Sequence, residues 1–119
     1  MKTAFLMATT LAAISLCPLT TSAASPVEAA FGNTIVSTYP SGRSTKLWLN
    51  RNGAYEGQRT NGKRTAGRWS LKGGKVCLKQ NGLPLTFCSK IPAGKVGTAW
   101  SSKSPKGEPL KNRLVSGRG

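Results

Sequence analysis

The side chains that could take part in chemistry are almost all basic. The chain of 119 residues contains 18 lysines and arginines, three acidic residues (Glu28, Glu56 and Glu108) and no histidine, for a formal net charge of +15. It therefore lacks a histidine base, a paired set of carboxylates and a Ser/His/Asp set, which are the usual groups for acid–base and nucleophilic catalysis. We expect a binding protein without a cofactor rather than an enzyme.

Cysteines offer a second kind of chemistry. Cys17 lies in an apolar N-terminal stretch, whereas Cys77 and Cys88 lie in the remainder of the chain. Two thiols without a histidine are too few ligands for a zinc site, and their spacing is not the C-x-x-C of redox motifs. An even number of cysteines in an exported chain is typical of a disulfide, with free buried thiols as the alternative.

Residues 1–24 have the pattern of a signal peptide. Lys2 supplies the positive start, an apolar stretch follows from 5 to 19, and the small residues Ala23 and Ala24 suit signal peptidase. The apolar stretch is short for a membrane span, although an uncleaved anchor is the alternative. The pattern predicts a periplasmic or secreted protein that loses Cys17 with its signal peptide.

Glycine-containing turns recur at short, even intervals in the rest of the chain. They divide it into runs with strand character at 34–39, 44–50, 54–60, 64–72, 75–80, 85–91, 98–103 and 109–116. Short strands joined by tight turns are typical of all-β folds. We predict a small eight-stranded antiparallel up-and-down meander over 33–116, closed into a barrel whose interior is filled by side chains. A flexible leader at 25–32 and a disordered tail at 117–119 flank it.

Alternation of residue types predicts the buried face of the middle strands. The expected core residues there are Trp69, Leu71, Val76, Leu78 and Phe87. Turn lengths then predict the register of three strands. A two-residue turn at 73–74 sets Trp69 opposite Leu78, and a four-residue loop at 81–84 sets Leu78 opposite Phe87.

The same register makes the two remaining cysteines neighbours. Cys77 then stands directly opposite Cys88 on the outward face of the sheet. Residues paired in this way are close enough for a disulfide. The sequence therefore predicts a Cys77–Cys88 bond.

Basic side chains gather on that outward face. Lys72, Lys75 and Lys90 form one row across three strands, and Arg68 stands opposite Lys79. The predicted binding residues are Arg64, Arg68, Lys72, Lys75, Lys79 and Lys90. Like charges placed directly opposite destabilise a sheet by up to about 1 kcal/mol per pair. Either the face is a solubilising surface only, or an anionic partner supplies the missing charge.

We favour a basic binding module for polyanions such as lipopolysaccharide, acidic glycans, anionic lipids or nucleic acid, acting as a monomer. Sequence-specific recognition of nucleic acid is not expected, because only Trp48 and Tyr55 could supply exposed rings. The sequence does not decide which face these two rings occupy. The alternative is an exported inhibitor or interaction protein that docks a loop, such as 81–84 or 93–97, on an acidic envelope protein or enzyme.

A longer series of motifs is similar to a known family. Asn33-Thr34, Gly67-x-Trp69, Val76-Cys77-Leu78, Cys88 and Val96-Gly97-x-x-Trp100 resemble those of small exported bacterial proteins that have a compact β domain and no assigned biochemical role. The resemblance extends from residue 33 to the end of the chain. It implies a Gram-negative periplasmic setting and offers no catalytic or ligand residue to transfer. The strongly basic composition departs from the family.

Overall fold

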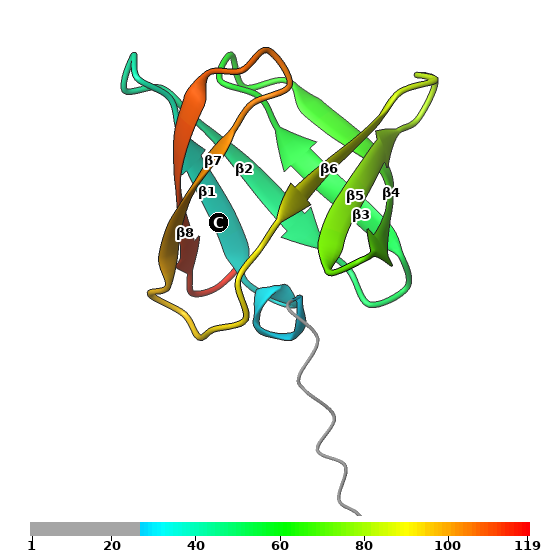
Figure 1. The fold of residues 1–119 in the computed structure, drawn as a ribbon, viewed down its shortest axis with the longest axis horizontal. Helices are drawn as coiled ribbons and strands as arrows, with labels where there is room; N and C mark the ends of the chain where they lie inside the picture. Colours follow the sequence, from blue (N-terminus) through cyan, green and yellow to red (C-terminus); the bar gives the residue numbers. More distant parts are fainter. Residues whose placement is uncertain (1–26) are drawn as a thin grey trace, which may run out of the picture.

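The computed structural model describes residues 27–119, so the predicted signal peptide lies outside the described residues. A short 3-10 helix is followed by eight strands (Figure 1). The elements are η1 (Glu28–Ala30), β1 (Thr34–Thr38), β2 (Ser44–Leu49), β3 (Ala54–Gln58), β4 (Arg64–Lys72), β5 (Lys75–Gln80), β6 (Thr86–Lys90), β7 (Ala99–Lys103) and β8 (Pro109–Val115). The prediction of an all-β fold with eight antiparallel strands is confirmed. Within this part of the chain, no helix has the length and apolar character needed to cross a membrane.

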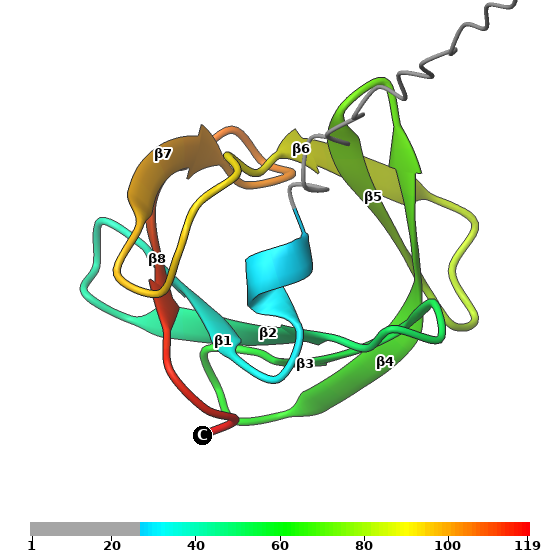
Figure 2. The ribbon, with the colours of Figure 1, turned by 90° about the horizontal axis from the view of Figure 1, so that it is seen from below.

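The strands form one antiparallel sheet that curls into a barrel. Their order is β6-β5-β4-β3-β2-β1-β8-β7. Each strand therefore pairs with the next strand in the chain, except that β6 and β7 do not pair in the part that the structure describes. The first strand, β1, also pairs with the last strand, β8. The predicted up-and-down meander is therefore confirmed. Between residues 27 and 119 no ladder links β6 to β7, so the barrel is nearly closed and its one gap lies between these two strands (Figure 2).

The predicted register of the middle strands is also confirmed. Lys75 pairs with Lys72 on β4 and with Lys90 on β6, and Cys77 pairs with Cys88. A disulfide joins the two cysteines, whose Cα atoms are 3.9 Å apart. The predicted disulfide is thus present, and it links β5 to the strand that borders the gap.

The buried core includes the residues around η1 and draws on more strands than the middle hairpins predicted from the sequence. Its buried members are Val27, Ala30, Ile35, Leu49, Tyr55, Val76 and Leu114. Of the predicted core residues, Val76 is buried, whereas Trp69, Leu78 and Phe87 are half-buried. The predicted burial of Leu71 is wrong, since this side chain is 41% exposed. Alternation gives the side of the strand on which Leu71 lies, but it does not show whether another element covers the last residues of β4.

One end of the barrel is closed by η1 and the residues around it. Val27 and Ala30 are buried in the core, and Phe31 packs against Trp69 with 5.7 Å between ring centroids. The guanidinium of Arg51 covers the Phe31 ring from 4.6 Å. Figure 2 shows η1 lying across this opening. Within the predicted flexible leader 25–32, residues 27–31 therefore have specific contacts, whereas residues 25 and 26 lie outside the described range.

The disulfide generates the first testable prediction. Changing Cys77 and Cys88 together to serine should lower the free energy of unfolding by about 3 kcal/mol or less, because the bond closes a short loop. Thermal unfolding of protein that lacks residues 1–24 measures the effect. A reductant should lower the melting temperature of the parent protein and leave that of the double variant unchanged. Two reactive thiols in protein purified from an oxidising compartment would contradict the prediction.

Candidate functional site

Four lysines form an exposed basic surface on the outer side of β4, β5 and β6. We call this surface the lysine face, and its members are Lys72, Lys75, Lys79 and Lys90. Lys75 stands between Lys72 and Lys90 in adjacent ladders. The ion pairs found within residues 27–119 are Arg51–Glu28 and Arg118–Glu56. None of the four lysines is therefore paired with a carboxylate in the described part of the chain.

The two arginines predicted to join this surface turn toward other strands. The Nη2 group of Arg68 donates a hydrogen bond to the carbonyl of Asn52 at 3.4 Å, in the β2–β3 turn. The guanidinium of Arg64 lies over the ring of Trp48, 4.8 Å from its centroid. Arg68 nevertheless stands directly opposite Lys79 in the β4–β5 ladder, and Lys75 stands opposite Lys72 and Lys90. Arg64 pairs with Gln58 instead, and its guanidinium packs on Trp48 of β2.

Trp48 faces outward from β2, yet its ring is covered. It is only 3% exposed, and its Nε1 group donates a hydrogen bond to Thr34 Oγ1 at 2.8 Å. Arg64 and Arg118 flank the ring, with guanidinium-to-centroid distances of 4.8 and 5.6 Å. Because these groups occupy the surroundings of the ring, Trp48 is not free to stack on a base or sugar in this structure.

Residues 116–119 supply part of that cover. The N–H of Gly117 donates to Asn33 Oδ1 at 2.9 Å, and its carbonyl accepts a hydrogen bond from Thr34 Oγ1 at 2.6 Å. Arg118 forms an ion pair with Glu56 across the Trp48 ring. The segment assigned from sequence to a disordered tail thus has defined partners on β3 and at the start of β1. A Gly-Arg-Gly sequence carries no local signal for these contacts, since all the partners lie far away along the chain.

The barrel interior holds a cavity of about 260 Å³. The prediction that side chains fill the barrel is therefore wrong. Large apolar side chains such as Ile35, Leu47, Phe87 and Trp100 line the cavity, but many other inward positions are small. These small residues are Ser37, Thr45, Gly57, Thr65, Ser89 and Ser102. The side chains of these small residues are too short to meet across the barrel. The alternation of residue types along the strands already placed them on the inward side, so the sequence contained a signal for the cavity.

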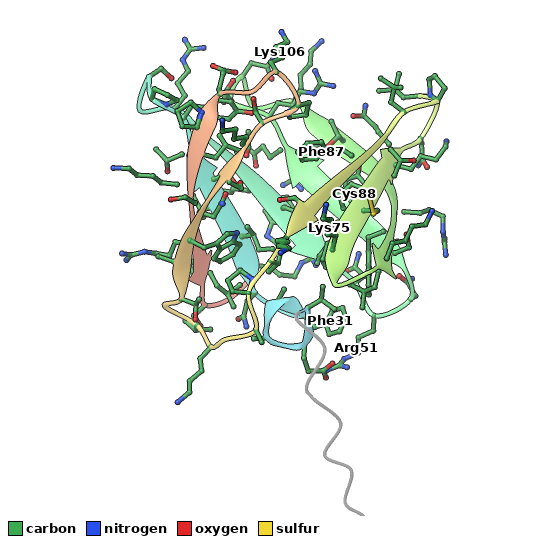
Figure 3. The ribbon with its side chains drawn as sticks, viewed as in Figure 1. Phe31, Arg51, Lys75, Phe87, Cys88 and Lys106 are labelled. Atoms are coloured by element: carbon green, nitrogen blue, oxygen red, sulfur yellow. A yellow bond between two sulfur atoms is a disulfide. The ribbon has the colours of Figure 1, made fainter. Side chains whose placement is uncertain are left out.

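The cavity lies toward the end of the barrel opposite η1. Its lining there includes Tyr39, Arg59 and Pro105, which are in or next to the turns between strands. Figure 3 shows Phe31 and Arg51 beside η1 at one end of the barrel and Lys106 in the β7–β8 turn at the other, with Phe87 between them. The residues around η1 thus block one end of the barrel interior, and the cavity lies toward the opposite end.

Two polar features interrupt the apolar wall. Buried Asn112 accepts a hydrogen bond from Ser37 Oγ at 2.6 Å and donates one to Ser102 Oγ at 2.9 Å. Tyr55 is 6% exposed and lines the cavity, and its phenol forms no hydrogen bond with any residue in the described range 27–119. Burial raises the pKa of the Tyr55 phenol above its usual value, and the nearby Arg59 guanidinium opposes that shift.

Tyr55 is held in place over Gly67. The two residues face each other in the β3–β4 ladder. A Cβ atom at Gly67 would lie 2.7 Å from Tyr55 Cε2 and 2.1 Å from the carbonyl oxygen of Lys79. Only glycine therefore lets the ring and the β5 backbone approach so closely. The glycine of the Gly67-x-Trp69 motif thus positions a side chain of the cavity wall.

Comparisons with known proteins leave the site to be judged on its geometry. No protein-family model matches the chain, and no curated protein or solved structure is significantly similar to it. The resemblance described from the sequence motifs stays a prediction. Within residues 27–119, no cluster of three or more potential metal-binding side chains occurs. The candidate sites are therefore the lysine face outside the barrel and the cavity inside it.

The close approach of Tyr55 to Gly67 gives the second testable prediction. Gly67→Ala should lower the free energy of unfolding by about 1–3 kcal/mol, because the added methyl group forces strand β5 and the ring apart. Chemical denaturation measures the change. Ala66→Ser is the matched control, since Ala66 is the exposed neighbour of Gly67 on the same strand. Equal stability of the two variants would contradict the close approach.

Proposed function

We propose that this protein is an exported basic module that binds polyanions through the lysine face, acting as a monomer. Candidate ligands are lipopolysaccharide, acidic glycans, anionic lipid head groups and nucleic acid bound without sequence selectivity. The signal-peptide pattern supports a periplasmic or secreted location. The proposal involves no catalytic step and no cofactor. Its main support is the position of Lys75, which lies directly between Lys72 and Lys90 in the ladders.

The geometry of the lysine row suits a linear polyanion. Neighbouring strands in a sheet lie about 4.8 Å apart, so the three backbone positions of the row span about 10 Å. Their flexible side chains can reach successive negative charges over a similar length. Each lysine that pairs with the polyanion would release counterions from it, which makes affinity fall steeply as salt increases.

The absence of nearby carboxylates favours an external anion. Like charges in facing positions cost up to about 1 kcal/mol per pair, and Lys75 takes part in two such pairs. In the described part of the chain, both ion pairs lie on other surfaces. A bound polyanion would remove this repulsion and gain the attraction of several lysines at once.

A second candidate function rests on the loop between β5 and β6. Leu83 and Leu85 in this loop are 46% and 80% exposed. Val96, in the loop between β6 and β7, is 47% exposed. Leu83 and Leu85 are close together on one loop, and exposed apolar side chains that lie together mark contact sites for protein partners. They support the alternative of an exported inhibitor or interaction protein that docks on an acidic envelope protein or enzyme.

The third testable prediction concerns the lysine row. Replacing Lys72, Lys75 and Lys90 together with glutamine should weaken binding to heparin, measured by titration at several salt concentrations. The slope of log affinity against log salt should become shallower by about one unit for each lysine–anion pair removed. The free energy of unfolding should stay level or rise, because repulsion within the row is relieved.

A matched control separates this local effect from a change in net charge. Lys63, Lys95 and Lys106 are exposed and lie in turns and loops, so their joint replacement with glutamine removes the same charge elsewhere. The control should retain most of the heparin affinity. Equal reductions in both triple variants would show that net charge alone matters. The docking loop has a different expected result. Binding to an acidic protein partner that persists near half-molar salt and is abolished in Leu85→Ser would favour the docking loop over the lysine face.

A further inference from the structure

The barrel cavity is large enough for a small molecule and has the lining of a ligand site. An engineered apolar cavity of 150 Å³ in another protein binds benzene, so about 260 Å³ has room for about ten non-hydrogen atoms. Native interiors are normally packed without such voids. Apolar walls do not hold ordered water well. The walls of an empty cavity of this size therefore lack packing interactions that an apolar occupant could supply.

The shape of the cavity is built into the sequence of the strands. Ser37, Ser89 and Ser102 occupy inward positions where larger side chains would close the space. At the other end, Val27 and Ala30 are buried as a plug. An occupant would enter from the end that carries the β1–β2, β3–β4 and β7–β8 turns. A small molecule that enters there passes the side chains at that end before it reaches the apolar walls.

Those side chains carry positive charge and free hydrogen-bond donors. Arg59 lines the cavity and forms no ion pair within residues 27–119. Its approach to Gln80 Oε1, at 3.5 Å, is at the limit of a hydrogen bond. Exposed Lys63 and Lys106 lie in the adjacent turns. A carboxylate would be drawn to this end and could accept hydrogen bonds from the guanidinium.

Deeper in the cavity, Tyr55 adds a donor without an acceptor. Its side chain is more than nine-tenths buried, and within residues 27–119 the phenol has no hydrogen-bond partner. Buried polar groups in native proteins are almost always hydrogen-bonded. Because Tyr55 lines the same cavity as Arg59, one anionic group between the two side chains could accept hydrogen bonds from both.

We propose that the cavity binds a small anionic amphiphile, with an apolar body of about ten non-hydrogen atoms among the strand side chains and a carboxylate at Tyr55 and Arg59. This site is separate from the lysine face, which lies on the outer side of β4, β5 and β6. It therefore extends the protein's binding chemistry beyond polyanions. The ligand class is a medium-chain or aromatic monocarboxylic acid.

Calorimetric titration of the protein with decanoate tests the proposal. One decanoate should bind per protein, whereas decanol, which lacks the charge, and butyrate, which lacks the long body, should each bind at least tenfold more weakly. Ser89→Leu, which fills the cavity, should abolish binding while the melting temperature stays level or rises. Arg59→Gln and Tyr55→Phe should each weaken binding about tenfold without unfolding the protein.

The lysine-face triple variant separates this site from the proposed function. It should bind decanoate with unchanged affinity even if it no longer binds heparin. Unchanged decanoate affinity in both Arg59→Gln and Tyr55→Phe would show that the carboxylate does not bind at Tyr55 and Arg59. Failure of decanoate to bind, or equal binding by folded Ser89→Leu, would overturn the cavity site itself. Neither result would depend on whether the lysine face binds polyanions.

Discussion

The pairing of β1 with β8 is the interaction on which the rest of the structure depends. It joins residues Thr34–Thr38 to Lys111–Val115, at opposite ends of the described chain. Such a pairing must overcome the entropy of closing a very long loop, which local hairpins avoid. In return it curls the sheet so that every strand gains one inward and one outward face. The cavity and the lysine face are separate surfaces because of this curl.

The segments that flank the sheet complete the barrel in different ways. Before β1, Val27 and Phe31 pack inside the ring and close one end. After β8, Gly117 and Arg118 cross the outside and cover Trp48. Both arrangements depend on the pairing of β1 with β8. This pairing places the start of β1 beside the end of β8, so the segment before β1 and the segment after β8 begin at the same end of the barrel. The only remaining break in the sheet, within residues 27–119, lies between β6 and β7.

Features that depend on neighbours in the chain could be predicted from the sequence. The Gly73-Gly74 turn sets the β4–β5 register, and the loop 81–84 carries it to β6, so the Cys77–Cys88 bond followed from turn lengths alone. Features that depend on distant elements could not be predicted in this way. Whether Leu71 is covered depends on what lies across the barrel from the end of β4, which alternation within one strand does not describe.

The direction of long side chains shows the same limit. Parity placed Arg64 and Arg68 outside the barrel, but it did not show that Trp48 and Asn52 would attract them toward β2 and the β2–β3 turn. The cavity had a visible signal in small inward residues such as Ser37 and Ser102. To predict the cavity, the side-chain volumes at the inward positions of all eight strands must be added together, because the residues of one strand do not show whether the barrel interior is filled.

The outside and the inside of this one barrel should bind different anions independently. Amide-resolved NMR of a single labelled sample, titrated first with a heparin fragment and then with decanoate, tests this most directly. Heparin should shift the amides around Lys72, Lys75 and Lys90, and decanoate should then shift those around Ser37, Tyr55 and Ser102 without reversing the first set. If both ligands shift the same residues, or if decanoate displaces heparin, the barrel does not present two independent binding surfaces.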